Sequence, residues 1–268
     1  GKGFTFDDRE SRSDTVSSVG EMHQLISEDS RNADIIFPYL GGEELNDDPR
    51  QLHHRYVINF GSRSEAEARE WPKLLHIVES KVKPERLQNN REVYRKLWWQ
   101  FGEKQTSLYR SMASLIRVLA RSLVSSHHAV AWQSTDRVLA HTLAVFTDDR
   151  DGFFAVMQSR VHELWARFFA STLEDRLRYT PSDCFETFPF PAGWETNAAL
   201  EDLGRRYHAR RAEIMVARNE GLTKTYNRFH DPDETDDDIT QLRALHDAMD
   251  RAVLDAYFQE NPRARGYV

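Results

Sequence analysis

Basic and aromatic side chains alternate in residues 81–121, a combination that suits contact with a polyanion. Ten basic residues lie here against three acids, a local charge of +7. The basic residues are Lys81, Lys83, Arg86, Arg91, Arg95, Lys96, Lys104, Arg110, Arg117 and Arg121, and the acids are Glu85, Glu92 and Glu103. Basic groups contact phosphates and aromatic rings stack on bases, so this composition favours a nucleic-acid surface. A solvated helix face is the alternative.

Residues 231–255 have the opposite character. Nine acids stand here against Arg243 and Arg251, a local charge of -7. The acids are Asp231, Asp233, Glu234, Asp236, Asp237, Asp238, Asp247, Asp250 and Asp255. Six of them fall at the end of an expected loop, where they suit solvent and the start of a helix. An acidic loop beside long helices also allows a protein-docking module, without direct base readout.

Residues for metal or hydrolytic chemistry are present only as fragments of motifs. Pro232-Asp233 begins a nuclease motif, but no Glu-x-Lys follows it, and Glu79-Ser-Lys81 lies near the end of an expected helix. His53-His54 and His127-His128 place successive side chains on opposite strand faces, so neither pair chelates one ion easily. These histidines are expected to be structural or to face DNA. A hydrolase that uses His53 or His127 is a third possibility.

Methyl transfer also lacks its motifs. The glycine pairs at Gly1-Lys-Gly3 and Gly41-Gly42 are not flanked by the strand and helix of a cofactor loop. The strings nearest to an Asn/Asp-Pro-Pro-aromatic loop, Asp48-Pro49-Arg50 and Asn261-Pro262-Arg263, do not match it. Ser125-Ser126 has no nucleophile elbow around it. We therefore expect no catalytic site, no cofactor site and no metal site in this chain.

Length and composition indicate a folded protein of one or two domains. The chain has 268 residues, 40% of them hydrophobic, and a net charge of -7. Its single cysteine, Cys184, cannot form an intramolecular disulfide and reads as a small buried thiol. No apolar run reaches the length of a membrane span, and the first ten residues lack the apolar run of a signal peptide. We expect a cytoplasmic protein, and the missing initiator methionine predicts a fragment whose catalytic partners lie upstream.

Hydrophobic periodicity and the positions of capping residues and prolines predict an α+β protein. Helices are expected over 14–36, from a capping box at Ser64 and Glu67 to an end before Pro84, over 152–170, over 197–218 and over 236–258. A turn is expected at Pro38 and the Gly41-Gly42 pair. Strands are expected over 55–60 and within 116–146, with a hairpin turn at 134–136, and a packed helix or turn over 88–110. Prolines keep 176–191 extended. The first domain, 1–191, then holds a small antiparallel sheet with flanking helices, and 192–268 is a C-terminal helical pair.

Several short sequence segments occur in an order that resembles the order found in one protein family. They are Ile36–Glu44, His54–Phe60, Lys81–Arg86, Trp98–Trp99, Ser159–Trp165, Leu177–Pro191 and Leu222–Phe229. The chain resembles the C-terminal part of fused type II restriction-modification enzymes, the type IIG or MmeI-like class, or of adenine-specific DNA methyltransferases related to them. The resemblance covers essentially the whole chain, and the order of the strings is more specific than any one of them.

The resemblance implies a target recognition domain followed by a short helical region. It implies that this chain reads base edges in the major groove of double-stranded DNA, while an upstream core of the same polypeptide flips and methylates an adenine. The missing motifs agree, because the family carries them upstream. S-adenosylmethionine, and Mg²⁺ if a nuclease is fused, are then expected in the parent enzyme and not in this chain.

Residue type selects candidates for both kinds of DNA contact. The candidates for phosphate contact are Lys81, Lys83, Arg91, Arg95, Lys96 and Lys104. The candidates for base reading are Arg117, Ser125, Ser126, His127, Arg160, Arg176, Arg178, Ser182 and Asp183. Ion pairs of Arg160 with Glu163 and of Arg176 with Asp175 are the alternative for those two arginines. We expect the aromatic residues Tyr56, Trp99, Tyr179, Phe185, Phe188 and Phe190 in the core.

Overall fold

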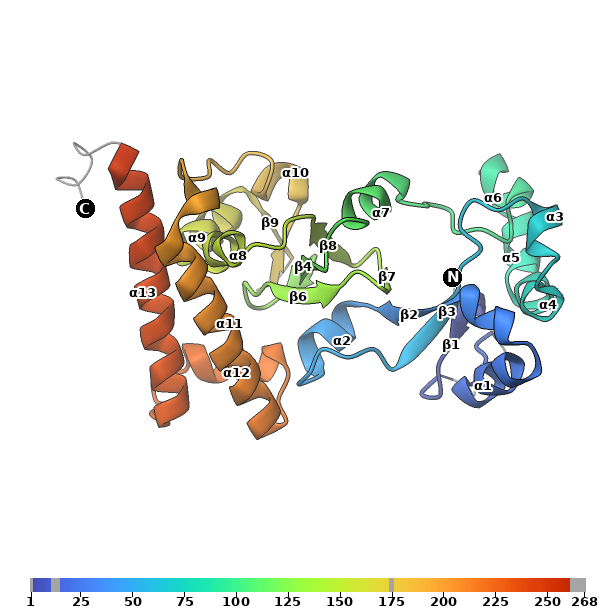
Figure 1. Cartoon of the computed structure of the whole chain (residues 1–268), viewed down its shortest axis with the longest axis horizontal. Helices are drawn as coiled ribbons and strands as arrows, with labels where there is room; N and C mark the ends of the chain where they lie inside the picture. Colours follow the sequence, from blue (N-terminus) through green and yellow to red (C-terminus); the bar gives the residue numbers. More distant parts are fainter. Residues whose placement is uncertain (1, 11–14, 174–175, 261–268) are drawn as a thin grey trace. The chain divides into compact units, whose positions relative to one another are not determined.

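The computed structural model describes residues 2–10, 15–173 and 176–260, and it divides into two compact units (Figure 1). Unit 1 is Gly1–Leu40, His53–Arg110 and Asp136–Leu139; unit 2 is Gly41–Leu52, Ser111–Thr135 and Ala140–Val268. Helices and small sheets occur in both, so the α+β prediction is confirmed. This division runs inside the predicted 1–191 domain, and residue 191 lies within unit 2. No helix in the described ranges is long and apolar enough to cross a membrane.

Unit 1 contains a four-stranded sheet in the order β1-β3-β2-β7. Its strands are β1 (Thr5–Phe6), β3 (Arg55–Ile58), β2 (Ile36–Leu40) and β7 (Val138–Leu139). β3 confirms the predicted strand, but β2 lies where a turn was expected at Pro38. Proline lacks a donor, and β2 tolerates it because β7 pairs only with Tyr39 and Leu40, beyond the proline.

Short helices cover this sheet. They are η1 (Lys2–Phe4), α1 (Val19–Glu28), η2 (Ser30–Asp34), α3 (Glu65–Ala68), α4 (Pro72–Lys81), α5 (Lys83–Leu87), α6 (Glu92–Lys96) and α7 (Thr106–Met112), the last of which crosses into unit 2. The capping box is present, with Ser64 Oγ accepting from the Glu67 amide at 3.3 Å. The single long helix expected after it is wrong, because α3 ends at Ala68 and Pro72 starts a second helix, α4. The predicted helix end before Pro84 is confirmed, because α4 ends at Lys81 and Pro84 lies at the start of α5.

Unit 2 contains two three-stranded sheets. One has the order β6-β4-β8, from β6 (Ala131–Ser134), β4 (Arg117–Ser122) and β8 (Leu143–Phe146); the other has the order β5-β10-β9, from β5 (Val124–Ser125), β10 (Arg176–Arg178) and β9 (Ser171–Leu173). Strands were correctly expected here. The predicted hairpin at 134–136 is wrong, because β4 lies between β6 and β8 and pairs with both.

The helices of unit 2 form its second layer, and α8 packs on α11. They are α2 (Gly42–Asp47), α8 (Asp151–Gln158), α9 (Arg160–Phe169), α10 (Pro181–Cys184), η3 (Trp194–Thr196), α11 (Ala198–Arg218), α12 (Leu222–His230) and α13 (Asp237–Glu260). The helix predicted over 152–170 is two helices, because Ser159 has extended backbone and caps α9 through the His162 amide. The expected loop over 222–238 contains α12.

Candidate nucleic-acid interface

A cleft of about 640 Å³ opens on unit 2. One part of its lining comes from β5 and β10 with the residues that follow β10, and a second part, here called the α2 wall, comes from α2 with Thr223 of α12. The segment between β4 and β5 and the residues before β8 complete the lining. The cleft is therefore assembled from chain segments that lie far apart in the sequence.

β10 directs two arginines to one side of its sheet. Alternate residues of a strand face the same way, so Arg176 and Arg178 share a face, both exposed, while Leu177 between them is buried. Pairing with β5 places Arg178 opposite Val124 and Leu177 opposite Ser125. This ladder brings Arg176, Arg178, Ser125 and Ser126 into one cleft lining, so four of the nine predicted base-reading residues lie together.

A buried arginine supports the floor of the cleft. Arg121 is fully buried, and its guanidinium lies 4.0 Å from the ring centre of Tyr179, which lines the cleft. Its Nη1 donates to His128 Nδ1 at 2.8 Å, and His128 Nε2 contacts the Met157 carbonyl at 2.7 Å. Burial lowers the pKa of Arg121 to about 10, so the group stays charged at neutral pH. Burial also holds the pKa of His128 well below its usual value, which keeps this acceptor neutral.

Tyr179 is fixed on its other side as well. Its hydroxyl lies 2.9 Å from Nε2 of the buried His162, and its backbone amide donates to the Leu123 carbonyl at 2.7 Å. Burial raises the pKa of Tyr179 and lowers that of His162 to about 3, so both groups are neutral. Tyr179 thus joins β10 to the end of β4 as a rigid part of the floor, and its predicted core position is confirmed.

The α2 wall is held by contacts that the sequence did not reveal. Asn46 Nδ2 donates to Ser122 Oγ at 2.8 Å, and Thr223 Oγ1 donates to Asp47 Oδ1 at 3.2 Å. A Cβ on Gly221, which caps α12, would lie 2.4 Å from the backbone of α2. Only glycine permits this close approach, so α2 and α12 form one wall. The lining residues missed from the sequence include Gly42, Glu43, Asn46, Asp47, His141, Thr142 and Thr223.

The other predicted base-reading residues lie outside the cleft. Ser182 and Asp183 are exposed on α10, directly after the cleft residue Pro181. His127 follows the cleft serines, but its Nε2 contacts Asn227 Oδ1 at 2.7 Å and its ring stacks on His230. A base contact by His127 would therefore have to replace its bond to α12.

Arg117 and Arg160 have partners within unit 2. Arg117 donates to Asp151 at 2.9 Å and lies 4.0 Å from the ring centre of Trp132, which gives it a packing role. Arg160 approaches Asp250 on α13 at 3.7 Å, whereas Glu163 pairs with Arg167, so the expected Arg160–Glu163 pair is absent from the described ion pairs. The alternative pair of Arg176 with Asp175 involves a residue outside the described ranges.

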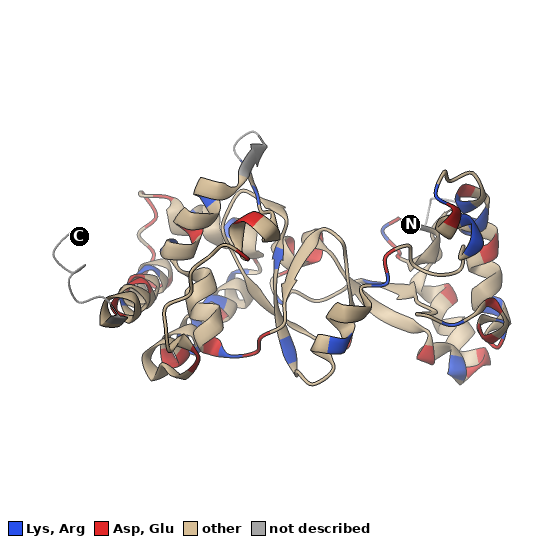
Figure 2. Ribbon diagram, turned by 90° about the horizontal axis from the view of Figure 1, so that it is seen from above, with Lys and Arg blue, Asp and Glu red and all other residues tan. Residues whose placement is uncertain are grey.

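The candidates for phosphate contact lie in unit 1, where several have local partners. Lys81 donates to Ser17 Oγ at 2.8 Å, Lys83 pairs with Glu79 at 2.6 Å, and Lys96 pairs with Glu92 at 2.7 Å. Arg95 donates to two backbone carbonyls, those of residues 89 and 90. Arg91 is exposed and Lys104 is half-buried. Figure 2 shows both signs of charge along these helices, so the +7 counted in the sequence is partly neutralised locally.

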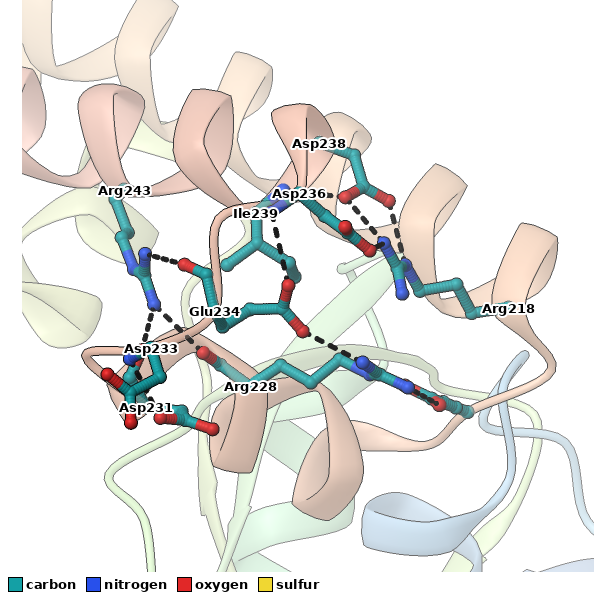
Figure 3. A network of polar contacts seen from close by, with 10 residues as sticks. Arg218, Arg228, Asp231, Asp233, Glu234, Asp236, Asp238, Ile239 and Arg243 are labelled. Atoms are coloured by element: carbon teal, nitrogen blue, oxygen red, sulfur yellow. Dashed lines mark hydrogen bonds and ion pairs between the residues drawn. The ribbon is translucent and has the colours of Figure 1, made fainter.

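The acidic loop of the C-terminal region is also neutralised within the chain. Arg218 pairs with Asp236 at 2.6 Å and with Asp238 at 2.7 Å, and Arg228 pairs with Glu220 and Glu234 at 2.9 and 2.8 Å (Figure 3). Arg243 donates to four backbone carbonyls, those of residues 228, 229, 231 and 234. These arginines tie α11 and α12 to the start of α13. Much of the charge that suggested a protein-docking module is therefore used inside the fold.

Comparison with known families now identifies the chain. The model of the MmeI target recognition domain matches residues 14–192. The chain belongs to the MmeI target recognition domain family. The match ends one residue beyond the predicted boundary at 191 and includes β10 and α2, so both walls of the cleft fall largely inside it, while α12 lies after it.

A solved structure has the same fold as this MmeI-family chain. It is the type IIL restriction-modification enzyme MmeI in complex with DNA, with 19% sequence identity and a TM-score of 0.65. The similarity covers 96% of this chain and 31% of that chain, so this chain spans about a third of the length of the enzyme it matches. The comparison with curated proteins yields no match. The family is a recognition domain, which agrees with the non-catalytic role expected from the sequence.

Proposed function

We propose that this chain recognises the DNA target sequence of a restriction-modification enzyme, and that the unit 2 cleft reads the bases. The observation that carries the proposal is the pair of exposed arginines on one face of β10, beside Ser125 and Ser126 in the same cleft. Arginine donates two hydrogen bonds to the N7 and O6 acceptors of guanine, and serine donates or accepts with either kind of base. The cleft thus combines donors that distinguish bases with a rigid floor.

The remaining candidate residues either position the protein on the DNA or contribute in a smaller way to sequence specificity. Lys81, Lys83, Arg91, Arg95, Lys96 and Lys104 contact phosphates in this proposal, which fixes the register of the protein on the duplex without reading its sequence. Five further candidates have secondary roles in this proposal. Three of them, Arg117, His127 and Arg160, have partners within unit 2, and the other two, Ser182 and Asp183, lie just outside the cleft. Residues 1–191 form the recognition domain and 192–268 its helical C-terminal region.

The parent enzyme supplies the chemistry in this proposal. The solved MmeI structure extends well beyond the part that this chain matches. In the parent of the present chain, we propose an adenine-specific methyltransferase core upstream in the same cytoplasmic polypeptide. S-adenosylmethionine binds that core, and Mg²⁺ binds a nuclease if one is fused. The methyltransferase flips an adenine, and the present chain determines which adenine is presented.

A binding measurement tests the proposal directly. The purified chain is titrated against a fluorescent random-sequence duplex at about 50 and 200 mM salt, and bound sequences are selected from the same pool. We expect binding that weakens by orders of magnitude with salt and a selected set enriched in one short sequence. Strong binding that does not weaken with salt would contradict phosphate contact by the basic residues. Salt-dependent binding without any sequence enrichment would contradict target recognition.

A further inference from the structure

The α2 wall presents two carboxylates to the same cleft. Glu43 and Asp47 are four residues apart on α2, so their side chains leave one face of the helix, and both are exposed and line the cleft. Thr223 donates to Asp47 Oδ1 and so fixes the direction of that carboxylate. Two acids on one helix face repel each other, and neither contributes to the buried core. Both carboxylates line the same cleft as Arg176 and Arg178.

The chemistry of the two walls is complementary. β10 offers guanidinium donors through Arg176 and Arg178, whereas α2 offers only acceptors through Glu43 and Asp47. In the major groove a G·C pair shows two acceptors on guanine, N7 and O6, beside one donor on cytosine, the N4 amine. A cleft with donors on one wall and acceptors on the other therefore matches both halves of this pair.

Phosphate contact does not explain the two acids. A carboxylate beside the DNA backbone repels phosphates and lowers affinity for every sequence. The same group becomes favourable where it accepts a hydrogen bond from an exocyclic amine. We propose that Glu43 and Asp47 are specificity-determining residues that accept hydrogen bonds from the N4 amine of cytosine, opposite the guanine-reading arginines. This inference rests on the proposed function, since it assigns the base chemistry of the same cleft.

The substitutions Glu43→Gln and Asp47→Asn test the inference, because each keeps the shape and removes the charge. An amide also donates, and asparagine and glutamine pair with adenine N6 and N7, so the variants should lose their preference for cytosine at one position by about tenfold or more. Their affinity for random duplex should rise about twofold or more at low salt, because a negative charge has left the interface. Selection from a randomised duplex pool reads the first effect, and titration reads the second.

Controls separate this inference from the function it deepens. Glu213→Gln removes an exposed carboxylate on α11, outside the cleft lining, and should change neither quantity. A uniform gain in affinity with unchanged sequence preference would overturn base reading by α2 and leave the cleft on DNA. If the α2 variants change neither quantity while Arg178→Ala relaxes specificity, only the inference fails. If Arg178→Ala is silent too, the proposed function fails with it. Thermal unfolding at the wild-type temperature shows that the variants are folded.

Discussion

The cleft of unit 2 and the basic segment of unit 1 hold their cationic side chains in different ways. In the segment, Lys83 and Lys96 lie on short helices, each with a carboxylate four residues earlier. In the cleft, Arg176 and Arg178 project from a strand whose next residue, Tyr179, is locked between Arg121 and His162. Base reading requires groups held on a rigid support, whereas phosphate contact tolerates mobile side chains. The rigid support of Arg176 and Arg178 is thus the reason why we propose that the cleft, and not the basic segment, reads the bases.

The largest difference between the cleft and the basic segment is expected in how much their side chains contribute to the free energy of unfolding. Arg121→Ala should lower the free energy of unfolding by about 2–4 kcal/mol, because it leaves a cavity under Tyr179 and an unpaired His128 nitrogen. Lys83→Ala should leave stability nearly unchanged, since exposed ion pairs contribute little. Urea denaturation measures both. Arg121→Met, which restores most of the volume, should recover part of the loss; equal stability of the Arg121→Ala and Lys83→Ala proteins would refute a supporting floor.

The next largest effect is expected on DNA sequence specificity when an arginine of the cleft is removed. Arg178→Ala, and separately Arg176→Ala, should relax recognition at one base pair by about 1–3 kcal/mol, because each removes one two-pronged contact to guanine. Target-sequence profiles of the parent enzyme carrying each change would show it. A loss that is equal for all sequences would move these arginines into the class of phosphate contacts and remove the distinction between the two regions.

The loss of stability at acid pH should also depend on buried histidines of unit 2. Burial lowers the pKa of His162 and of His208 to about 3, below the usual value, so protons bind the unfolded chain first and stability falls as pH drops. Each histidine should cost about 1 kcal/mol of the free energy of unfolding between about pH 7.5 and 5.5. His162→Gln should flatten the profile, as measured by urea denaturation across that range.

The smallest effect is expected from the basic segment. Lys96→Ala should weaken binding to every duplex by less than about threefold and reduce the slope of log affinity against log salt by about 1. Titrations at several salt concentrations provide both values. A change in sequence preference caused by Lys96→Ala would show that the segment reads bases, contrary to the comparison drawn above.

Local signals in the sequence were sufficient for much of the fold. The box at Ser64 and Glu67, the strand at β3 and the long helices α11 and α13 depend on neighbouring residues, and all are present. The hairpin at 134–136 failed because strand order depends on pairing with β4, which precedes both strands in the chain. Prolines and Ser159 interrupted predicted helices where period alone was continuous.

The residues of the candidate site also divide into those that the sequence could identify and those that it could not. Arg176, Arg178, Ser125 and Ser126 could be chosen by residue type on predicted extended segments. The α2 wall could not, because Asn46 meets Ser122 and Asp47 meets Thr223 across 76 and 176 residues of sequence. A charge count is incomplete for a related reason, since counting acids and bases in residues 81–121 does not show that Glu79, just outside this window, pairs with Lys83.

The path of the chain has a consequence for engineering. The two units are interleaved along the sequence, with unit 2 made from Gly41–Leu52, Ser111–Thr135 and Ala140–Val268. A contiguous graft of residues 111–191 into a relative would transfer β5 and β10 but leave behind α2, which lines the same cleft. Natural recombination at a single crossover meets the same obstacle. New specificities in this architecture should therefore arise by coordinated point changes on both walls more readily than by exchange of a cassette.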